Sequence, residues 1–383
     1  MSFHKTLLSA AAAVICSTSL AAADSQDVFS KDAITAVIKR AADHNLRLQA
    51  DNKQTSKADI NYEWVRGAFY TGVMGLYYAT GDEKYLKAAL DYSESRNWQL
   101  DKPETRHADW QCIGQTYAEL FLIQKNREGK GDPHRIGGIR KNIDAMIATP
   151  QPGRVDWWWC DALYMAPPVL GRLYRATGDQ KYLDYLHTMY WDTYEFLYDK
   201  DEHLWFRDRN YFDKQTTSGK KVFWSRGNGW VHAGLARLIP YIPKDDPQRG
   251  KYVQLFKDMS TKIASLQPED GLWRPSLLDP NDVPTSETSG SAFYTYALAW
   301  GINEGLLDRA KYEPVVKKGW AGLVSAVTPE GKLGYVQAVA AAPGPVKPED
   351  TREYAVGAFL LAGKEMLRLL HGAQDDLNPA NYK

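Results

Sequence analysis

The 383-residue chain has no excess of charge of either sign, because 47 Lys and Arg residues balance 47 Asp and Glu residues. Zero net charge gives no electrostatic reason to expect nucleic acid or an anionic membrane surface as a partner. The sequence also lacks a serine nucleophile elbow, a phosphate-binding loop and a dinucleotide fingerprint. His107 and His232 are not spaced as ligands, and no cluster of Cys, His and Asp indicates a metal site.

Long apolar runs are confined to the start of the chain. His4 and Lys5 precede an apolar stretch from Leu7 to Leu20, which ends in three alanines before Asp24. This pattern is typical of a signal peptide with an Ala-x-Ala cleavage site, and no later stretch is long enough to be transmembrane. Residues 1–23 are therefore predicted to be a signal peptide, and the mature protein is predicted to be exported to the periplasm or secreted.

Cysteine is scarce, and only Cys112 and Cys160 lie beyond the signal peptide. Export would permit a disulfide between them. Each cysteine, however, lies within three positions of Asp109 or Asp161, and a bridge there would crowd the site proposed below. We therefore expect two small, buried thiols.

Aromatic residues, in contrast, are abundant, with 13 Trp and 23 Tyr. Flat amphipathic rings stack on the faces of sugars, although large helical proteins also use such residues to fill the core.

An internal repeat indicates helix pairs. The segment Ala79-Thr-Gly-Asp-Glu-Lys-Tyr-Leu recurs as Ala176-Thr-Gly-Asp-Gln-Lys-Tyr-Leu. In each copy Gly is expected to end one helix, Asp to cap the next, and Tyr-Leu to begin the buried face of that second helix.

Two alternating series of helices follow from these turns. Amphipathic helices are predicted near 31–49, 83–96, 134–148, 180–198, 249–266 and 311–326. Helices richer in Gly and Ala are predicted near 63–79, 108–124, 160–176, 226–240, 289–304 and 351–370. Six outer and six inner helices predict an all-α fold, a closed (α/α)6 barrel, and an open helical solenoid is the alternative. No domain boundary is visible, so residues 24–383 are expected to form a single catalytic domain.

Two connections are unusually long, 199–224 and 267–288. Both read as short β-excursions, and loops of this length in a compact helical domain are usually functional. Both lead into inner helices, so we expect them to lie at the rim of the barrel.

Asp109 and Asp161 occupy matching places in two consecutive repeats, each at the start of an inner helix. An Asp at such a place can simply cap the helix. Trp157, Trp158, Trp159 and Tyr164 surround Asp161 in sequence, however, and apolar rings raise the pKa of a carboxyl toward the range of a general acid. The pair is therefore the predicted catalytic centre.

The loop Ser225-Arg226-Gly-Asn-Gly-Trp230 is a candidate binding element. Arg226 offers a planar fork for a carboxylate, although it could instead pair with a structural Asp. Trp224 and Trp230 flank it as possible stacking walls, and Glu287 at the next inner helix reads as a cap.

With these residues in view, the chain resembles glycoside hydrolase family 105, the unsaturated rhamnogalacturonyl hydrolases and related unsaturated glucuronyl and galacturonyl hydrolases. The likeness covers most of the mature chain and rests on six motifs: Trp64-Val-Arg-Gly-Ala, Asp161-Ala-Leu-Tyr-Met-Ala, Trp224-Ser-Arg-Gly-Asn-Gly-Trp, Asp270-Gly-Leu-Trp, Glu287-Thr-Ser-Gly-Ser-Ala and Val356-Gly-Ala-Phe-Leu-Leu-Ala. The resemblance implies an (α/α)6 barrel without metal or organic cofactor. It also implies oligosaccharide substrates whose non-reducing end is a Δ4,5-unsaturated uronic acid left by a polysaccharide lyase.

The resemblance also implies roles for individual residues. Asp161 matches the general acid that protonates C4 and then activates water for attack at C5, and Asp109 matches the second Asp, which holds the ring hydroxyls or the water. Arg226, Trp224 and Trp230 would bind and stack the uronate.

Further substrate contacts are expected from Trp159, His107 and Arg207. Many members of the family have Leu-Phe-Tyr-His-Gly where this chain has Leu204-Trp-Phe-Arg-Asp, so Arg207 stands in place of a His.

Three other functions compete with this interpretation. A conventional inverting glycosidase would place two carboxylates astride an intact glycosidic bond. A sugar epimerase would need a pair of catalytic His residues, which no inner helix supplies. A non-catalytic glycan-binding protein would keep the Trp residues without needing Asp161. The sequence leaves open the source polysaccharide, the sugar next to the uronate and the oligomeric state.

Overall fold

The computed structural model describes residues 27–51 and 63–382, so the predicted signal peptide lies outside the described residues. Within these ranges the outer helices are α1 (Lys31–Ala50), α4 (Glu83–Ser95), α6 (His134–Ala148), α10 (Lys181–Leu197), α12 (Arg249–Ser265) and α14 (Arg309–Ser325). The inner helices are α3 (Glu63–Thr80), α5 (Gly114–Glu128), α9 (Pro167–Thr177), α11 (Ser225–Leu238), α13 (Thr288–Asn303) and α15 (Glu353–His371). The alternation predicted from the sequence is confirmed.

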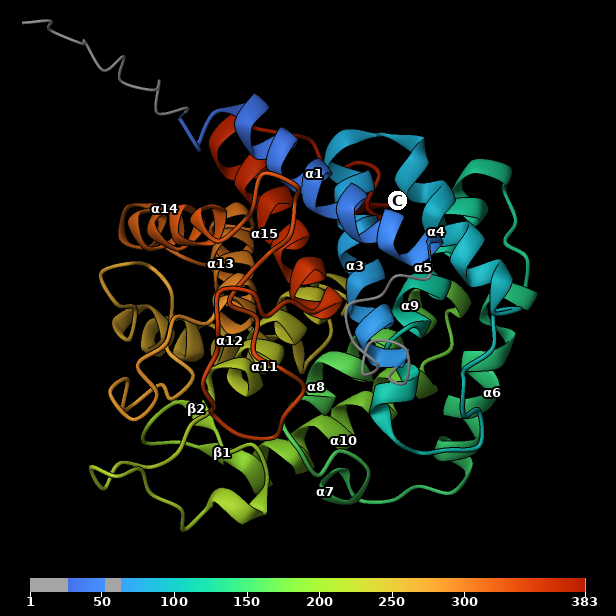
Figure 1. Ribbon diagram of the computed structural model, residues 1–383. Coiled ribbons are helices and arrows are strands. Elements are labelled where there is room, and N and C mark those ends of the chain that lie inside the picture. Colours follow the sequence, from blue (N-terminus) through green and yellow to red (C-terminus); the bar gives the residue numbers. More distant parts are fainter. Residues whose placement is uncertain (1–26, 52–62, 383) are drawn as a thin grey trace, which may run out of the picture.

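The inner helices form a closed ring. Each packs against the next along the chain, and α15 packs against α3, so the last inner helix meets the first (Figure 1). An open solenoid would keep its first and last repeats apart. The structure therefore confirms the (α/α)6 barrel over the solenoid.

Glycine allows the closing contact of the ring. A Cβ atom added to Gly72 of α3 would collide with the backbone of Gly357 in α15, and one added to Gly357 would collide with that of Ala68. The two helices therefore approach backbone to backbone, as the small-residue composition of the inner series predicts.

The repeated turns behave as expected. Gly81 and Gly178 end α3 and α9 with positive φ angles of 64° and 73°. The side chain of Asp82 accepts a hydrogen bond from Lys84 N, and that of Asp179 accepts one from Lys181 N. The same local chemistry therefore ends an inner helix and starts an outer helix in both copies.

Two inner helices differ from the prediction near their start. The stretch expected as a helix over 160–176 is divided into α8 (Ala162–Met165) and α9, because Pro167 and Pro168 have no backbone N–H to continue a helix. The stretch expected over 108–124 begins with a 3-10 turn, η1 (Ala108–Gln111), before α5. Both interruptions lie beside the predicted catalytic residues.

The long connections carry the only strands within the described ranges. Strands β1 (Tyr198–Asp199) and β2 (Leu204–Trp205) pair antiparallel, and Gln215 forms an isolated bridge with Lys221. Residues 267–288, which the structure describes throughout, contain no strand, and Ser276 only bridges to Trp224. The predicted β-excursion is thus confirmed for the first connection and reduced to one bridge in the second.

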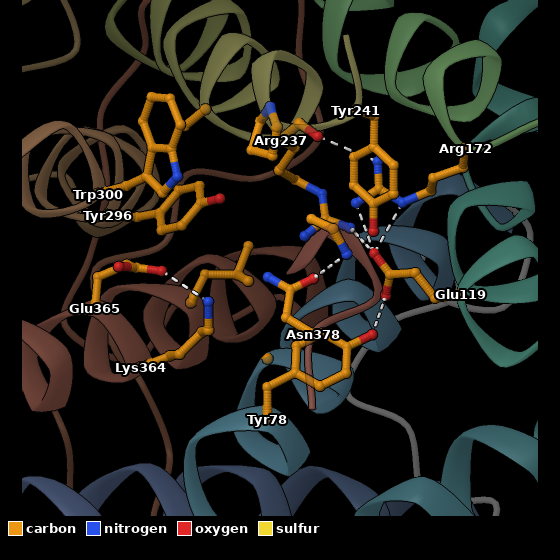
Figure 2. A pocket seen from close by; sticks show the side chains of 15 residues that line it. Tyr78, Glu119, Arg172, Arg237, Tyr241, Tyr296, Trp300, Lys364, Glu365 and Asn378 are labelled. Atoms are coloured by element: carbon orange, nitrogen blue, oxygen red, sulfur yellow. Dashed lines mark hydrogen bonds and ion pairs between the residues drawn. The ribbon is translucent and has the colours of Figure 1, made fainter. Parts of the chain in front are cut away.

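The end of the ring where the inner helices finish is filled by charged side chains around a cavity of about 30 Å³ (Figure 2). Glu119 Oε1 accepts hydrogen bonds from Arg172 Nη2 at 2.6 Å and from Arg237 Nη2 at 3.1 Å. Tyr78 OH donates to the other oxygen of Glu119 at 2.8 Å. Residues after α15, Asn378 among them, also line this cavity, so this end of the ring is closed.

Candidate active site

Asp109 and Asp161 lie close together at the end of the ring where the inner helices begin. Asp109 is in η1, and Asp161 immediately precedes α8, which contacts η1. Asp161 makes no capping hydrogen bond with its side chain, and the side chain that caps η1 belongs to His107. The capping explanation, which the sequence left open, therefore does not account for either carboxylate.

Asp109 is poised to hold a proton near neutral pH. Burial and then the negative charge of Asp161 raise the pKa of Asp109 to about 7, while Arg207 opposes the rise. About 23% of its side chain stays exposed, so the group is reachable from outside. Below about pH 7 the free protein thus presents Asp109 as a neutral carboxylic acid.

Asp161 is more deeply buried, with 12% of its side chain exposed. Burial raises its pKa, as the surrounding Trp residues predicted, but the positive charges of Arg207 and Arg226 counteract this rise. The Cys160 thiol donates to Asp161 Oδ2 at an S–O distance of 3.4 Å. Burial raises the pKa of Cys160, so this sulfur remains a protonated donor.

Cys112 and Cys160 are both buried and form no disulfide, which confirms the expectation of two thiols.

His107 and Trp159 form one side of the site. His107 Nδ1 accepts a hydrogen bond from Asp109 N at 3.4 Å and lies 3.7 Å from Asp109 Oδ2. Its ring lies 4.3 Å from that of Trp159, centroid to centroid. Burial, together with the charges of Arg207 and Lys102, lowers the pKa of His107, so the imidazole is neutral at neutral pH.

Arg207 forms the other side of the site. Its Nε lies 3.9 Å from Asp161 Oδ2, and its Nη1 donates to Asp208 Oδ2 at 2.6 Å. The guanidinium carbon lies 5.1 Å from the ring centroid of Trp158. Cys160 N donates to Arg207 O at 2.9 Å, which fixes the segment after β2 against the residue before Asp161. The structure thus brings Asp109, Asp161, His107, Trp159 and Arg207 together.

Arg226 differs from its predicted place. It is 1% exposed, and its Nη1 donates to Gln337 O at 2.9 Å and to Tyr354 OH at 2.7 Å. Its Nη2 donates to Ala338 O at 3.0 Å. The guanidinium therefore fastens the 337–340 segment to the barrel.

Trp224 and Trp230 are also buried, each at 1% exposure. Trp224 Nε1 donates to Gln337 Oε1 at 2.9 Å, and Trp230 packs against Tyr164 and Phe293. Almost no surface of these two residues or of Arg226 is therefore exposed for direct contact with a uronate.

Glu287, expected as a cap, is one: its side chain accepts from Ser289 N at 2.8 Å and Gly290 N at 2.7 Å.

Sequence reasoning missed Trp158 as a residue of the site surface. Trp157 and Trp159 are 0% and 3% exposed, whereas Trp158 is 39% exposed. Three successive side chains cannot all point into one core, so the run of three Trp residues was itself the available signal.

Among the residues that the structure describes, no three His, Cys, Asp or Glu side chains come together as a ligand set for a metal ion. No helix within the same ranges has the length and apolarity to cross a membrane.

A sequence model of the family described as Glycosyl Hydrolase Family 88 matches residues 37–370. A curated protein of Formosa agariphila, described as an unsaturated 3S-rhamnoglycuronyl hydrolase, is 42% identical over 324 residues, which cover 80% of this chain and 85% of the relative.

Two solved structures share both sequence and fold. One, described as a glycosyl hydrolase family 88 protein from Bacteroides vulgatus, is 33% identical, with a TM-score of 0.79 over 88% of this chain and 98% of its own. The second, described as a polysaccharide lyase, is 35% identical, with a TM-score of 0.78 over 88% of this chain and 96% of its own.

Proposed function

This chain belongs to glycosyl hydrolase family 88 and is a glycosidase, and we propose that it removes the Δ4,5-unsaturated uronic acid from the non-reducing end of lyase-generated oligosaccharides. The observation that carries the proposal is the pair of neighbouring carboxyl groups where the inner helices begin, with the pKa of Asp109 raised to about 7. Such groups can act as acids at neutral pH, and the curated relative is described as acting on an unsaturated sugar.

The reaction proposed is hydration of an enol ether. A proton from Asp161 adds to C4, and the electron pair of the C4=C5 bond forms the new C–H bond. The positive charge left at C5 is shared with the ring oxygen. Water then adds to C5 and gives its proton back to Asp161. The resulting hemiketal opens: the bond between C5 and the ring oxygen breaks, C5 becomes a ketone, and the hydroxyl proton passes to the former ring oxygen. C1 is then a hemiacetal, which collapses to an aldehyde as its hydroxyl proton passes to the oxygen of the departing sugar. The enzyme therefore does not have to protonate the glycosidic oxygen of the intact substrate.

The two carboxyl groups have different tasks in this scheme. Asp109, neutral below about pH 7, donates a hydrogen bond to a ring hydroxyl or to the attacking water. Asp161 is the proton donor, and the negative charge of the arriving uronate raises its pKa further. Arg207, with its Nε at 3.9 Å from Asp161 Oδ2, is placed to stabilise the carboxylate once the proton has left.

The arrangement favours hydration over conventional inversion. An inverting glycosidase needs one carboxylate on each side of the scissile bond. Here both carboxylates precede neighbouring inner helices, and the charge of Asp161 is strong enough at Asp109 to raise its pKa. A substrate whose sulfur replaces the glycosidic oxygen separates the two mechanisms, because hydration does not require protonation of that atom.

We propose further that the sugar next to the uronate is rhamnose, in line with the description of the curated relative, and that the enzyme acts after export. The predicted signal peptide, residues 1–23, supports the second statement.

The likeness to a protein described as a polysaccharide lyase gives a second candidate, β-elimination from an intact polysaccharide. Ultraviolet absorbance distinguishes them, because the conjugated C=C bond of an unsaturated uronate absorbs. Hydration of unsaturated disaccharides decreases the absorbance, whereas elimination from a saturated polymer increases it. An increase with the polymer and no decrease with several unsaturated disaccharides would overturn the proposed function.

A further inference from the structure

Large apolar side chains are exposed at only three places within the described ranges: Val155, Trp158 and Phe212. Val155 and Trp158 belong to the segment that leads to Asp161, and Phe212 belongs to the connection that contains Arg207. Trp158 lies against Arg207 of the site, whereas Phe212 packs against Phe196 and Phe206. An exposed aromatic ring beside a site marks a place where a ligand or partner binds.

Trp158 is connected to both carboxylates. Toward Asp161, the guanidinium carbon of Arg207 lies 5.1 Å from the Trp158 ring centroid, and Arg207 Nε lies 3.9 Å from Asp161 Oδ2. Toward Asp109, the ring of Trp159 lies 4.8 Å from that of Trp158 and 4.3 Å from that of His107. One side chain, that of Arg207, thus lies between the exposed indole and Asp161. On the other side, Trp159 and His107 lie between the indole and Asp109.

This position fits a sugar just outside the reacting ring. The unsaturated ring has to reach Asp109 and Asp161, so the sugar attached to its C1 lies farther toward solvent. Trp159 is too deeply buried to contact that sugar with a whole ring face, since it is only 3% exposed. His107 keeps 39% of its side chain exposed, but its Nδ1 lies 3.7 Å from Asp109 Oδ2, so it lies beside the reacting ring. Trp158 offers the exposed aromatic surface at the right depth.

We propose that the indole of Trp158 is the platform for the leaving sugar, and that Arg207 binds a polar group at the edge of the same sugar. Nη1 of Arg207 is engaged by Asp208, while its Nη2 makes no hydrogen bond within the described residues and is free to donate. Such a pair selects a pyranose with one apolar face and a polar edge, a description that a 6-deoxyhexose with its methyl group satisfies. The inference rests on the proposed function and specifies its leaving group.

The test compares two substrates that share the reacting ring. One is an unsaturated uronyl–rhamnose disaccharide, and the other is the methyl glycoside of the same unsaturated uronate, which has no leaving sugar. For Trp158→Ala we expect KM for the disaccharide to rise about tenfold, because stacking is lost, with no change for the methyl glycoside. For Trp158→Phe, KM for the disaccharide should lie between the values of the wild type and Trp158→Ala, since a smaller ring remains.

Val155→Ala is the matched control, because it removes exposed apolar surface from the same segment but no aromatic ring. It should leave both KM values unchanged. Equal effects of Trp158→Ala on both substrates, no effect on either, or an equal effect of Val155→Ala would overturn the inference. Failure of the wild-type protein to hydrate either substrate would refute the proposed function instead, so the two failures are distinguishable. If Trp158 instead binds a second copy of the chain, Trp158→Ala would change the oligomeric state and not the ratio of the two KM values, which also overturns the inference.

Discussion

Arg207 Nε lies 3.9 Å from Asp161 Oδ2, and the same guanidinium lowers the pKa of both Asp161 and Asp109. Arg207 therefore limits how far burial raises the pKa of the two carboxyl groups. Because the family resemblance places a His at this position, the pH range of this chain is expected to depend on its Arg.

Arg207→Gln should move the alkaline limb of the pH profile of kcat/KM upward by roughly one pH unit, because loss of the cation raises the pKa of Asp109 and Asp161. Arg209→Gln is the control: it removes the same charge from an exposed residue of the same connection. Initial rates across the pH range measure both variants. An unmoved limb in Arg207→Gln, or the same shift in Arg209→Gln, would refute this electrostatic role.

The ionisation of Asp109 should determine the pH above which kcat/KM falls. Its pKa of about 7 means that the neutral form is present below pH 7 and is lost as the pH rises through that value, so kcat/KM should fall above about pH 7. Asp109→Asn keeps a neutral hydrogen-bond donor at all pH values. We expect it to retain part of the activity and to lose the alkaline limb near pH 7. Complete inactivity at every pH would instead identify Asp109 as the proton donor.

The closed end of the barrel should matter for stability and not for catalysis. Burial opposes ionisation of Glu119, but the charges of Arg172 and Arg237 lower its pKa below the usual value. Glu119→Gln leaves two buried cations without their counter-charge and should reduce the free energy of unfolding by about 3–5 kcal/mol. Asp91→Asn, which breaks the exposed pair with Lys87, should cost less than about 1 kcal/mol. Chemical denaturation measures both, and equal losses would contradict the buried network.

The ring closure can be tested at a single atom. Gly357→Ala places a methyl group against the backbone of α3 and should destabilise the protein by about 1–3 kcal/mol. Gly137→Ala in α6 meets nothing within 4 Å and should stabilise it by roughly 0.5–1 kcal/mol, because Gly is unfavourable inside a helix. The two substitutions are chemically identical, so opposite signs in thermal unfolding would isolate the close packing of α3 and α15.

Local chemistry explains why so much of the fold was predictable. The turn at Gly81-Asp82 and its copy at Gly178-Asp179 end and start helices through contacts within a few residues, which a sequence displays directly. The break at Pro167 was also readable from the missing N–H but was absorbed into a longer apolar pattern.

The site was less predictable because its contacts join distant segments. Arg226 binds carbonyl groups of Gln337 and Ala338, and no local pattern reports that pairing. The exposure of Trp158 likewise depends on how the connection after β2 lies against the segment before Asp161. The residue types were therefore enough to predict the carboxylates, whereas the side chains around them could be placed only from the folded structure.

The most direct measurement follows the proton itself. Hydrolysis of an unsaturated disaccharide in heavy water, followed by nuclear magnetic resonance of the product, reports where and on which face the deuteron is added. If Asp161 delivers the proton, we expect one deuterium at C4 in a single configuration for the wild-type protein and a rate about a thousandfold lower for Asp161→Asn. Deuterium in both configurations, as expected when an ordinary glycosidase releases the sugar and C4 is protonated later in solution, would contradict it, as would an undiminished rate in Asp161→Asn.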